Sequence, residues 1–134
     1  MGFVLHDAAS WIGKPQVGDK ECVALIKILV PGLMQIGTIN WKEGAAVKGS
    51  PGLARGTAIA TFVKGRYPQS GSTGKHACIF LAHSGAGIWV LDQYTRSETI
   101  IRRHIGIPRD HKQRDDGTWP NASNNALSFS VIER

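Results

Sequence analysis

The stretch GDKECVALIKILVPG, residues 18–32, decides the fold because it predicts a helix that begins beside a cysteine. Asp19 is a residue type that caps helix N-termini, and the proline and glycine at the end of the stretch stop a helix. We therefore expect the helix to cover residues 17–30. Its apolar residues fall on every side, which predicts a helix buried within the domain. Cys22 then lies in the first helical turn, either as an inert core thiol or as a nucleophile.

Strand-like patterns replace the helical pattern after residue 55. Five runs are rich in β-branched and aromatic residues and cover residues 56–63, 75–81, 87–94, 100–105 and 126–132. The intervals between the runs are too short for crossover helices, so the sheet is expected to be antiparallel. We predict a single α+β domain over residues 1–134, with the helix packed on a four- to five-stranded antiparallel sheet.

The segments between these elements are rich in glycine or in polar residues. We expect residues 32–55 to be an ordered loop with short pieces of structure, and residues 65–74 to be a mobile loop just before His76. Residues 108–126 form a long polar connection, a type that is usually functional or disordered. A short helix is also expected around residues 6–12.

The composition fits one compact protein with a basic surface. With 134 residues, of which 42% are hydrophobic, the chain can bury a single core. The formal net charge of +6 favours an anionic partner, whether nucleic acid, a membrane surface or peptidoglycan. The tight basic cluster Arg102-Arg103-His104 lies outside any nucleic-acid-binding motif, so we expect no nucleic acid partner.

The N-terminal sequence lacks the pattern of a signal peptide, and the longest apolar run, residues 23–30, is too short to cross a bilayer. We expect a monomer that is made in the cytoplasm, does not insert into a membrane, and needs another machine for export. Two cysteines in a chain of this size do not make a disulfide scaffold, so free thiols are expected.

The predicted position of Cys22 suits a nucleophile. The unpaired backbone N–H groups and the positive dipole end of a first helical turn stabilise a thiolate. The same N–H groups can stabilise the oxyanion that forms when the thiolate attacks a carbonyl carbon. The first turn would therefore supply both the nucleophile and the oxyanion donors.

A catalytic thiolate needs an imidazole that shares its proton and later protonates the leaving amine. His76 is our candidate, because it opens a strand directly after a glycine-rich loop, where a side chain can be rigid and still face a cleft. The other histidines are at the far end of the same strand or in less ordered or more basic surroundings; they are His6, His83, His104 and His111.

The imidazole needs a hydrogen-bond acceptor on its second nitrogen. Asp92 lies in the apolar run IWVLDQY, where a carboxylate must be paired to be tolerated. The two-residue period of a strand puts Gln93 on the opposite face, so only one of these two residues can face His76. We choose Asp92, and Gln93 remains the alternative.

Cys78 lies two residues after His76 and is interpreted as a small core residue. A disulfide between Cys22 and Cys78 would disable the nucleophile and is a less favoured alternative. Zinc ligation by these two cysteines and His76 is less favoured still, because the sequence has no paired CxxC, HExxH or PCxxC motif. We therefore expect neither a metal nor another cofactor.

Four segments in a fixed order, DKECVALIK, LARGTAIATF, TGKHACIFL and GIWVLDQY, resemble the NlpC and CHAP families of papain-like cysteine peptidases and amidases. The resemblance implies a papain-like fold in which a cysteine starts the central helix and a histidine opens a strand. Carried over to this chain, it makes Cys22 the nucleophile, His76 the general base and Asp92 the residue that orients the base.

The chain is also similar to the small amidase effectors that bacteria inject into rivals through the type VI secretion system. This resemblance implies cleavage of amide bonds in peptidoglycan stem peptides or crosslinks, in the periplasm of a target cell. It also implies an immunity protein that plugs the cleft. A phage lysin or a tail-associated murein hydrolase would share these sequence features.

Trp41, Gln93 and Tyr94 are the residues that we expect to bind the substrate, and Tyr67 could line the same cleft. The alternative function is a noncatalytic basic module that binds cell-wall polymer or nucleic acid. In that case Cys22→Ala would leave function intact, and charge reversal at the two arginines of the basic cluster would abolish it.

Overall fold

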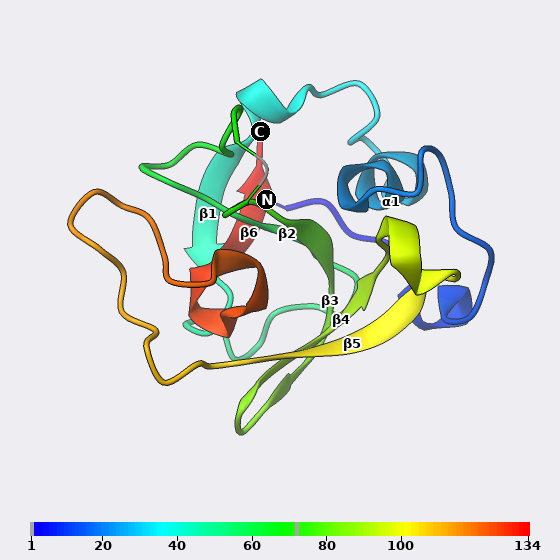
Figure 1. Ribbon diagram of the computed structural model, residues 1–134. Coiled ribbons are helices and arrows are strands. Elements are labelled where there is room, and N and C mark those ends of the chain that lie inside the picture. The colour runs from blue at the N-terminus through cyan, green and yellow to red at the C-terminus, as the bar shows by residue number, and fades with distance from the viewer. Residues whose placement is uncertain (1, 72) are drawn as a thin grey trace.

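The structure is a computed structural model that describes residues 2–71 and 73–134, and it shows an α+β fold built on one antiparallel sheet (Figure 1). The sheet has six strands in the order β1-β6-β2-β3-β4-β5. The strands are β1 (Lys42–Ala46), β2 (Ala58–Thr61), β3 (Ala77–Ser84), β4 (Gly87–Asp92), β5 (Ile101–Gly106) and β6 (Phe129–Glu133). The predicted α+β class is confirmed, and each of the five predicted strands lies within or close to its expected range.

The prediction of four or five strands is wrong by one, because β1 falls in the segment that was expected to be a loop. Its sequence, KEGAA, contains neither a β-branched nor an aromatic residue, so it carries none of the usual strand signals. The strand forms at the edge of the sheet by pairing with β6, for example Glu43 opposite Ile132. Its pairing partner, and not its own composition, makes this segment extended.

Helix α1 (Cys22–Leu29) is shorter than predicted and begins at the cysteine itself. The N-cap is Glu21, not Asp19. The Asp19 carboxylate instead accepts a hydrogen bond from the Glu21 N–H at 3.0 Å, and Lys20 between them has a left-handed φ of 71°. This turn delays the start of the helix by several residues relative to the prediction.

The remaining helical elements are single 3₁₀ turns. They are η1 (Ala8–Trp11), which lies inside the predicted short helix, η2 (Thr38–Asn40), η3 (Thr95–Ser97), η4 (Ala122–Asn124) and η5 (Ala126–Ser128). Within residues 2–71 and 73–134, no helix is long and apolar enough to cross a membrane.

Two apolar clusters lie on the two faces of the sheet. Helix α1 buries Leu25 and Ile26 against β3 residues such as Ile79. Its outer side is open, with Ile28 44% exposed, so the expectation of a helix buried on every side is wrong. The helix contributes one apolar face to the core, as an amphipathic helix does.

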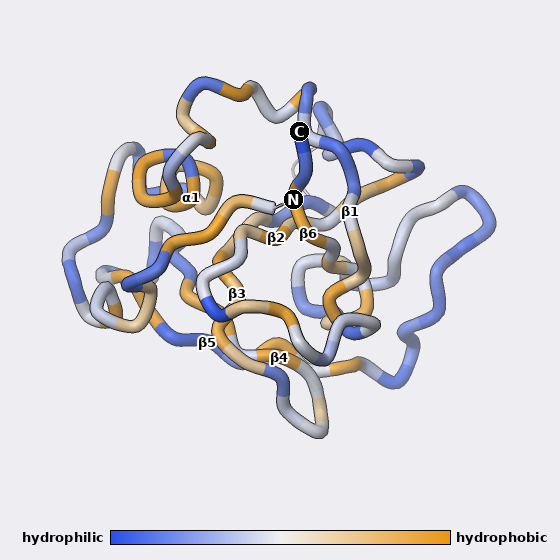
Figure 2. The backbone as a smooth tube through the Cα atoms, turned by 180° about the vertical axis from the view of Figure 1, so that it is seen from behind, coloured by the Kyte–Doolittle hydropathy of each residue, from blue (hydrophilic) through white to orange (hydrophobic). Residues whose placement is uncertain are grey.

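The second cluster lies on the other face and joins Cys78 and Phe80 of β3 to Phe129 at the start of β6. Figure 1 shows the turns η4 and η5 on the opposite side of β3 from α1. The connection that leads from β5 to these turns is largely hydrophilic (Figure 2), and it is exposed over most of residues 109–116. The long polar segment therefore ends in ordered turns that pack beside the sheet.

Candidate active site

The ends of β3, β4 and β5 bring three polar side chains together. These strands are antiparallel neighbours, with Val90 of β4 directly opposite Arg103 of β5. His76 immediately precedes β3, and Asp92 is the last residue of β4. The Nε2 atom of His76 lies 2.8 Å from Oδ2 of Asp92. The structure thus joins the predicted histidine to the predicted aspartate, as the strand periodicity requires.

Asp92 is fully buried, with 0% of its surface exposed, and both its carboxylate oxygens accept hydrogen bonds. Its Oδ2 atom accepts hydrogen bonds from His76 Nε2 and from Arg103 Nε at 2.9 Å. Its Oδ1 atom accepts the backbone N–H of Gln93 at 2.9 Å. A buried carboxylate is stable only when it is paired and hydrogen-bonded in this way. The arrangement fixes the direction of the carboxylate toward the imidazole.

The imidazole of His76 favours its protonated form. Burial opposes the charge, but the hydrogen bonds to Asp92 and to Cys22, together with the negative charges of both groups, raise the pKa of His76 to about 9. Because Nε2 bonds the carboxylate, Nδ1 is the ring nitrogen left for the thiol.

Cys22 is partly exposed at the first position of α1 and lines a cavity of about 330 Å³. Tyr67 and Lys75 line the same cavity. The Glu21 carboxylate, which lines the same cavity, accepts a hydrogen bond from Thr95 Oγ1 at 2.8 Å. The cavity thus lies at the N-terminal end of the helix, where the first-turn N–H groups have no acceptor within the helix.

Gln93 fixes the chain that leads into α1. Its side-chain oxygen accepts the N–H of Val17 at 3.0 Å, and its amide nitrogen donates to the carbonyl oxygens of Val17 and Glu21, each at 2.9 Å. The Gln93 side chain is fully buried. Its side-chain hydrogen bonds go to the backbone of Val17 and Glu21, so it holds the residue that precedes the cysteine.

Two aromatic residues predicted to bind substrate lie in different surroundings. Trp41 is fully buried and packs edge-on against Tyr67, with 4.9 Å between ring centroids, so a substrate has no access to it. Tyr67, which Trp41 supports, is the aromatic side chain that reaches the Cys22 cavity. Tyr94 is 43% exposed and lines a second cavity of about 450 Å³ with His76 and Arg103.

Both cysteines are free thiols. Cys78 is fully buried among apolar side chains, and burial raises the pKa of its thiol well above the ordinary value. Among the described residues, no group of three or more histidine, cysteine and acidic side chains is placed to hold a metal ion.

Three further histidines have partners outside the site. His83 pairs with the Ser50 carbonyl, His104 with the Ser84 hydroxyl and His111 with the Pro108 carbonyl.

Arg103 belongs to the site, although the sequence analysis treated it only as part of a basic cluster. Its guanidinium contacts Asp92 and lies 3.4 Å from His76 Nε2. The signal was available in the alternation of β5, where Ile101, Arg103 and Ile105 share one face. An arginine between two isoleucines on an inward face needs a buried acceptor, and Asp92 is on the adjacent strand.

Comparison with known proteins gives a consistent result over almost the whole chain. The family model of domesticated amidase effector 2 matches residues 4–119. A type VI secretion amidase effector 2 protein of Salmonella typhi is 36% identical over 138 aligned positions, which cover 99% of this chain and all of that protein. A domesticated amidase effector 2 of the tick Ixodes scapularis is 41% identical over 102 positions, covering 75% of this chain and 68% of its own length.

The solved structure of a type 6 secretion amidase effector 2 superposes with a TM-score of 0.89 at 36% identity. The superposition covers 97% of this chain and 93% of the solved one, so the fold described above is shared. The matching segment includes the helix that starts at Cys22 and all three strands that hold His76, Asp92 and Arg103. The chain belongs to the domesticated amidase effector 2 family of type VI secretion amidase effectors.

Proposed function

We propose that this protein is a secreted antibacterial amidase that cleaves amide bonds in the stem peptides or crosslinks of peptidoglycan, with Cys22 as nucleophile, His76 as acid and base, and Asp92 as the residue that orients His76. The observation that carries the proposal is the 2.8 Å contact between His76 and the buried Asp92, beside a cysteine at a helix N-terminus. The names of the relatives support amidase chemistry and export through type VI secretion.

The geometry supports a two-step reaction. The Cys22 thiolate attacks the carbonyl carbon of the amide, and the first-turn N–H groups stabilise the resulting oxyanion. The tetrahedral intermediate then breaks its C–N bond, and the nitrogen leaves as an amine with the proton of the His76 imidazolium. The neutral imidazole next takes a proton from water, and the hydroxide attacks the thioester. Collapse of this second intermediate releases the carboxylic acid and restores the thiolate and imidazolium.

Two cavities, one lined by Cys22 and the other by His76, suggest where the halves of the substrate lie. The cavity at Cys22 and Tyr67 suits the acyl half, because its carbonyl carbon bonds the sulfur. The cavity at His76 and Tyr94 suits the amine half, because the imidazole protonates the leaving nitrogen. Each cavity, at about 330 and 450 Å³, is large enough for one or two amino-acid side chains of a peptide.

The order of the three groups along the chain supports a papain-like mechanism of the NlpC and CHAP type. The positive net charge of +6 supports attraction to the anionic cell wall of a target, and this attraction should weaken with salt. We propose the periplasm of the target cell as the place of action and an immunity protein that covers the Cys22 cavity as the partner in the producing cell.

Digestion of purified muropeptides, with products identified by mass spectrometry, tests the proposal. Wild type and the control Cys78→Ala should release the same defined fragments, whereas Cys22→Ala should release none. Cys78 is the matched control because it is the second free thiol and lies in the apolar core. Cleavage by Cys22→Ala would overturn the assignment of the nucleophile. Unchanged muropeptides with all three proteins, under reducing conditions, would overturn the choice of substrate.

A further inference from the structure

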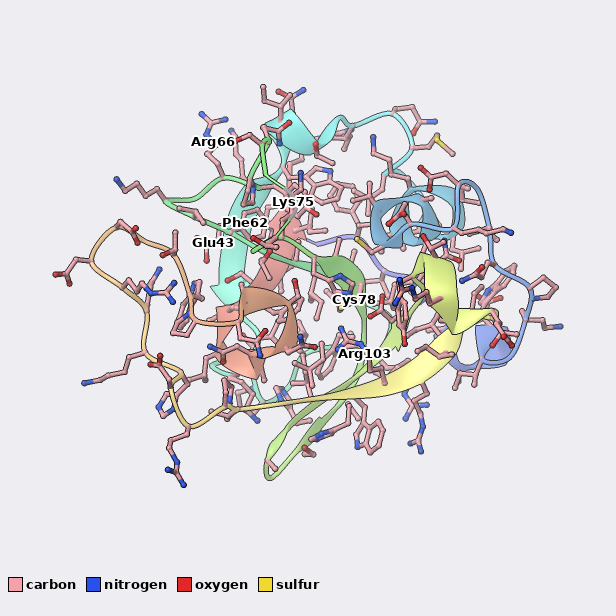
Figure 3. All side chains as sticks on the ribbon, in the orientation of Figure 1. Glu43, Phe62, Arg66, Lys75, Cys78 and Arg103 are labelled. Carbon is pink, nitrogen blue, oxygen red and sulfur yellow. The ribbon has the colours of Figure 1, made fainter. Side chains whose placement is uncertain are left out.

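Arg103 connects the proposed catalytic groups to the C-terminal turns. Its Nε atom lies 2.9 Å from Asp92 Oδ2, and one terminal nitrogen donates to Asn124 Oδ1 at 2.8 Å. The other terminal nitrogen lies 3.4 Å from the Ser123 carbonyl oxygen. In Figure 3, Arg103 lies close to Cys78, on the face of the sheet that carries the second apolar cluster. The side chain is 21% exposed, so most of it is enclosed.

We propose that Arg103 is a positioning residue that keeps the Asp92 carboxylate aimed at His76 throughout the reaction cycle. The inference rests on the proposed function and adds a fourth member to its site. It follows from the sharing of one carboxylate oxygen, Oδ2, by the imidazole and the guanidinium.

The need for a second cation arises when His76 changes its charge. After the imidazolium has protonated the leaving amine, the imidazole is neutral, and Asp92 is a fully buried carboxylate that has lost its cationic partner. The Arg103 guanidinium cannot be deprotonated in a protein, so its charge stays beside the carboxylate at this stage. A buried carboxylate is tolerated only when it is paired, so the guanidinium holds Asp92 in its orientation until the imidazolium forms again.

The same side chain orders the wall of the cavity that we assign to the amine half of the substrate. Ser123 and Asn124, which line that cavity, are held by Arg103, and Ser123 Oγ lies 3.4 Å from the Lys75 carbonyl oxygen next to His76. The turn η4 is thus attached both to β5 and to the residue before the imidazole. The length of arginine and its several donors are needed, because one nitrogen serves the carboxylate and the others serve the turn.

The test compares Arg103→Gln with Arg102→Gln in steady-state hydrolysis of a defined muropeptide. Arg102 lies on the other face of β5, stacked on Trp89 at 4.1 Å, so its substitution removes the same net charge without touching the site. Arg103→Gln should lower kcat on the order of 10- to 100-fold, as loss of an outer partner of a site residue does, and should also raise KM, because the turn that lines the amine cavity loses its anchor. Arg102→Gln should retain a kcat close to that of wild type.

The pH profile separates a positioning role from a structural one. The titratable groups around Arg103 are Asp92 on β4, His76 and Cys78 on or next to β3, and Tyr94, which lines the same cavity. Because the guanidinium is a positive charge beside both Asp92 and His76, its loss makes this pair hold its proton more tightly, and Arg103→Gln should move the alkaline limb of kcat/KM to higher pH. Arg103→Lys, which keeps the charge, should restore that limb toward wild type and recover part of kcat.

Three outcomes are decisive. An unshifted alkaline limb in Arg103→Gln, or equal kcat in the two glutamine variants, would overturn the proposal while leaving the Cys22 assignment intact. If Arg103→Gln does not fold, as judged by thermal denaturation, Arg103→Lys should still have a lower kcat than Arg102→Lys, because a lysine cannot serve the carboxylate and the turn together; equal kcat in the two lysine variants would then overturn the proposal. Activity that persists in Cys22→Ala would instead overturn the proposed function, so the two failures are distinguishable.

Discussion

Asp92 and Gln93 are consecutive residues whose side chains leave the end of β4 in opposite directions and hold two different parts of the site. Asp92 binds the imidazole of His76, and Gln93 binds the backbone on both sides of the turn that leads into Cys22. The relative position of nucleophile and base therefore depends on one strand end. A shift of this strand by a single residue would turn each side chain to the opposite face of the sheet, away from its present partners.

Gln93→Ala should destabilise the protein and slow the reaction. The substitution removes three hydrogen bonds, including the one that the Val17 N–H donates to the Gln93 side-chain oxygen, at a cost of about 2–3 kcal/mol; the Val17 carbonyl keeps its bond from the Lys20 N–H. Urea denaturation measures the loss of stability, and kcat reports the misplacement of the cysteine. Gln113→Ala is the control, because that side chain makes one exposed loop contact, to the Gly117 carbonyl. Equal stability of the two variants would contradict the anchoring role of Gln93.

The stability of the wild-type protein should fall between pH 6.5 and about 9. His76 has a folded-state pKa of about 9, above its ordinary value of 6.5, so its protonation stabilises the folded state. This contribution is complete below pH 6.5 and is lost as the pH rises through about 9. The free energy of unfolding should fall by at most roughly 3 kcal/mol over this range, because each pKa unit corresponds to about 1.4 kcal/mol.

Denaturation by urea at a series of pH values measures this dependence. Asp92→Asn should flatten it, because the main groups that raise the pKa of His76 are the Asp92 carboxylate and Cys22. His104→Gln, at a histidine that pairs with the Ser84 hydroxyl, should leave the pH dependence unchanged. A wild-type curve without slope in this range would show that His76 gains no proton affinity on folding.

The two thiols should differ sharply in alkylation. Iodoacetamide at neutral pH should modify Cys22, which is partly exposed at the head of α1, and leave Cys78 intact, because it is fully buried and burial raises the pKa of its thiol. Mass spectrometry of the intact protein should show one adduct under native conditions and two in urea. An adduct on Cys78 in the native protein would contradict its enclosed position.

Tyr67→Phe should lower kcat by about 10-fold while changing stability little. The ring keeps its contact with Trp41, but the hydroxyl beside Cys22 is lost. Burial, together with the charge on Cys22, raises the pKa of this hydroxyl, so it remains a hydrogen-bond donor toward the sulfur. Kinetics and thermal denaturation of the same sample measure both effects. A large drop in melting temperature with unchanged kcat would assign the hydroxyl to packing alone.

The sequence was informative where a local pattern coincides with the final structure. The four strands between residues 56 and 105 are predictable from their many β-branched and aromatic residues. The apolar residues around Asp92 in the sequence indicate a paired carboxylate. The start of α1 was misplaced, because Asp19 makes an Asx-type turn to Glu21 instead of capping the helix. Local sequence preference does not distinguish these two uses of an aspartate.

Other features depend on contacts between distant segments and leave no local signal. The strand β1 exists because β6 pairs with it, and Trp41 next to it is enclosed by the fold although aromatic residues of this type also line clefts. Arg103 acquires its role only when β4 and β5 are aligned in the observed register. The residue pattern of one segment does not specify which strand it pairs with or in which register, because both depend on the assembled sheet.

The enclosure of Cys78 leaves Cys22 without a resolving thiol. A sulfenic acid formed on Cys22 by peroxide would condense with an accessible cysteine, but the second thiol of this chain is sealed in the apolar cluster on the other face of the sheet. The oxidised protein cannot repair itself by internal disulfide exchange and depends on a small-molecule or protein reductant from its surroundings. The redox state of the compartment in which the protein works therefore sets how long the thiol survives.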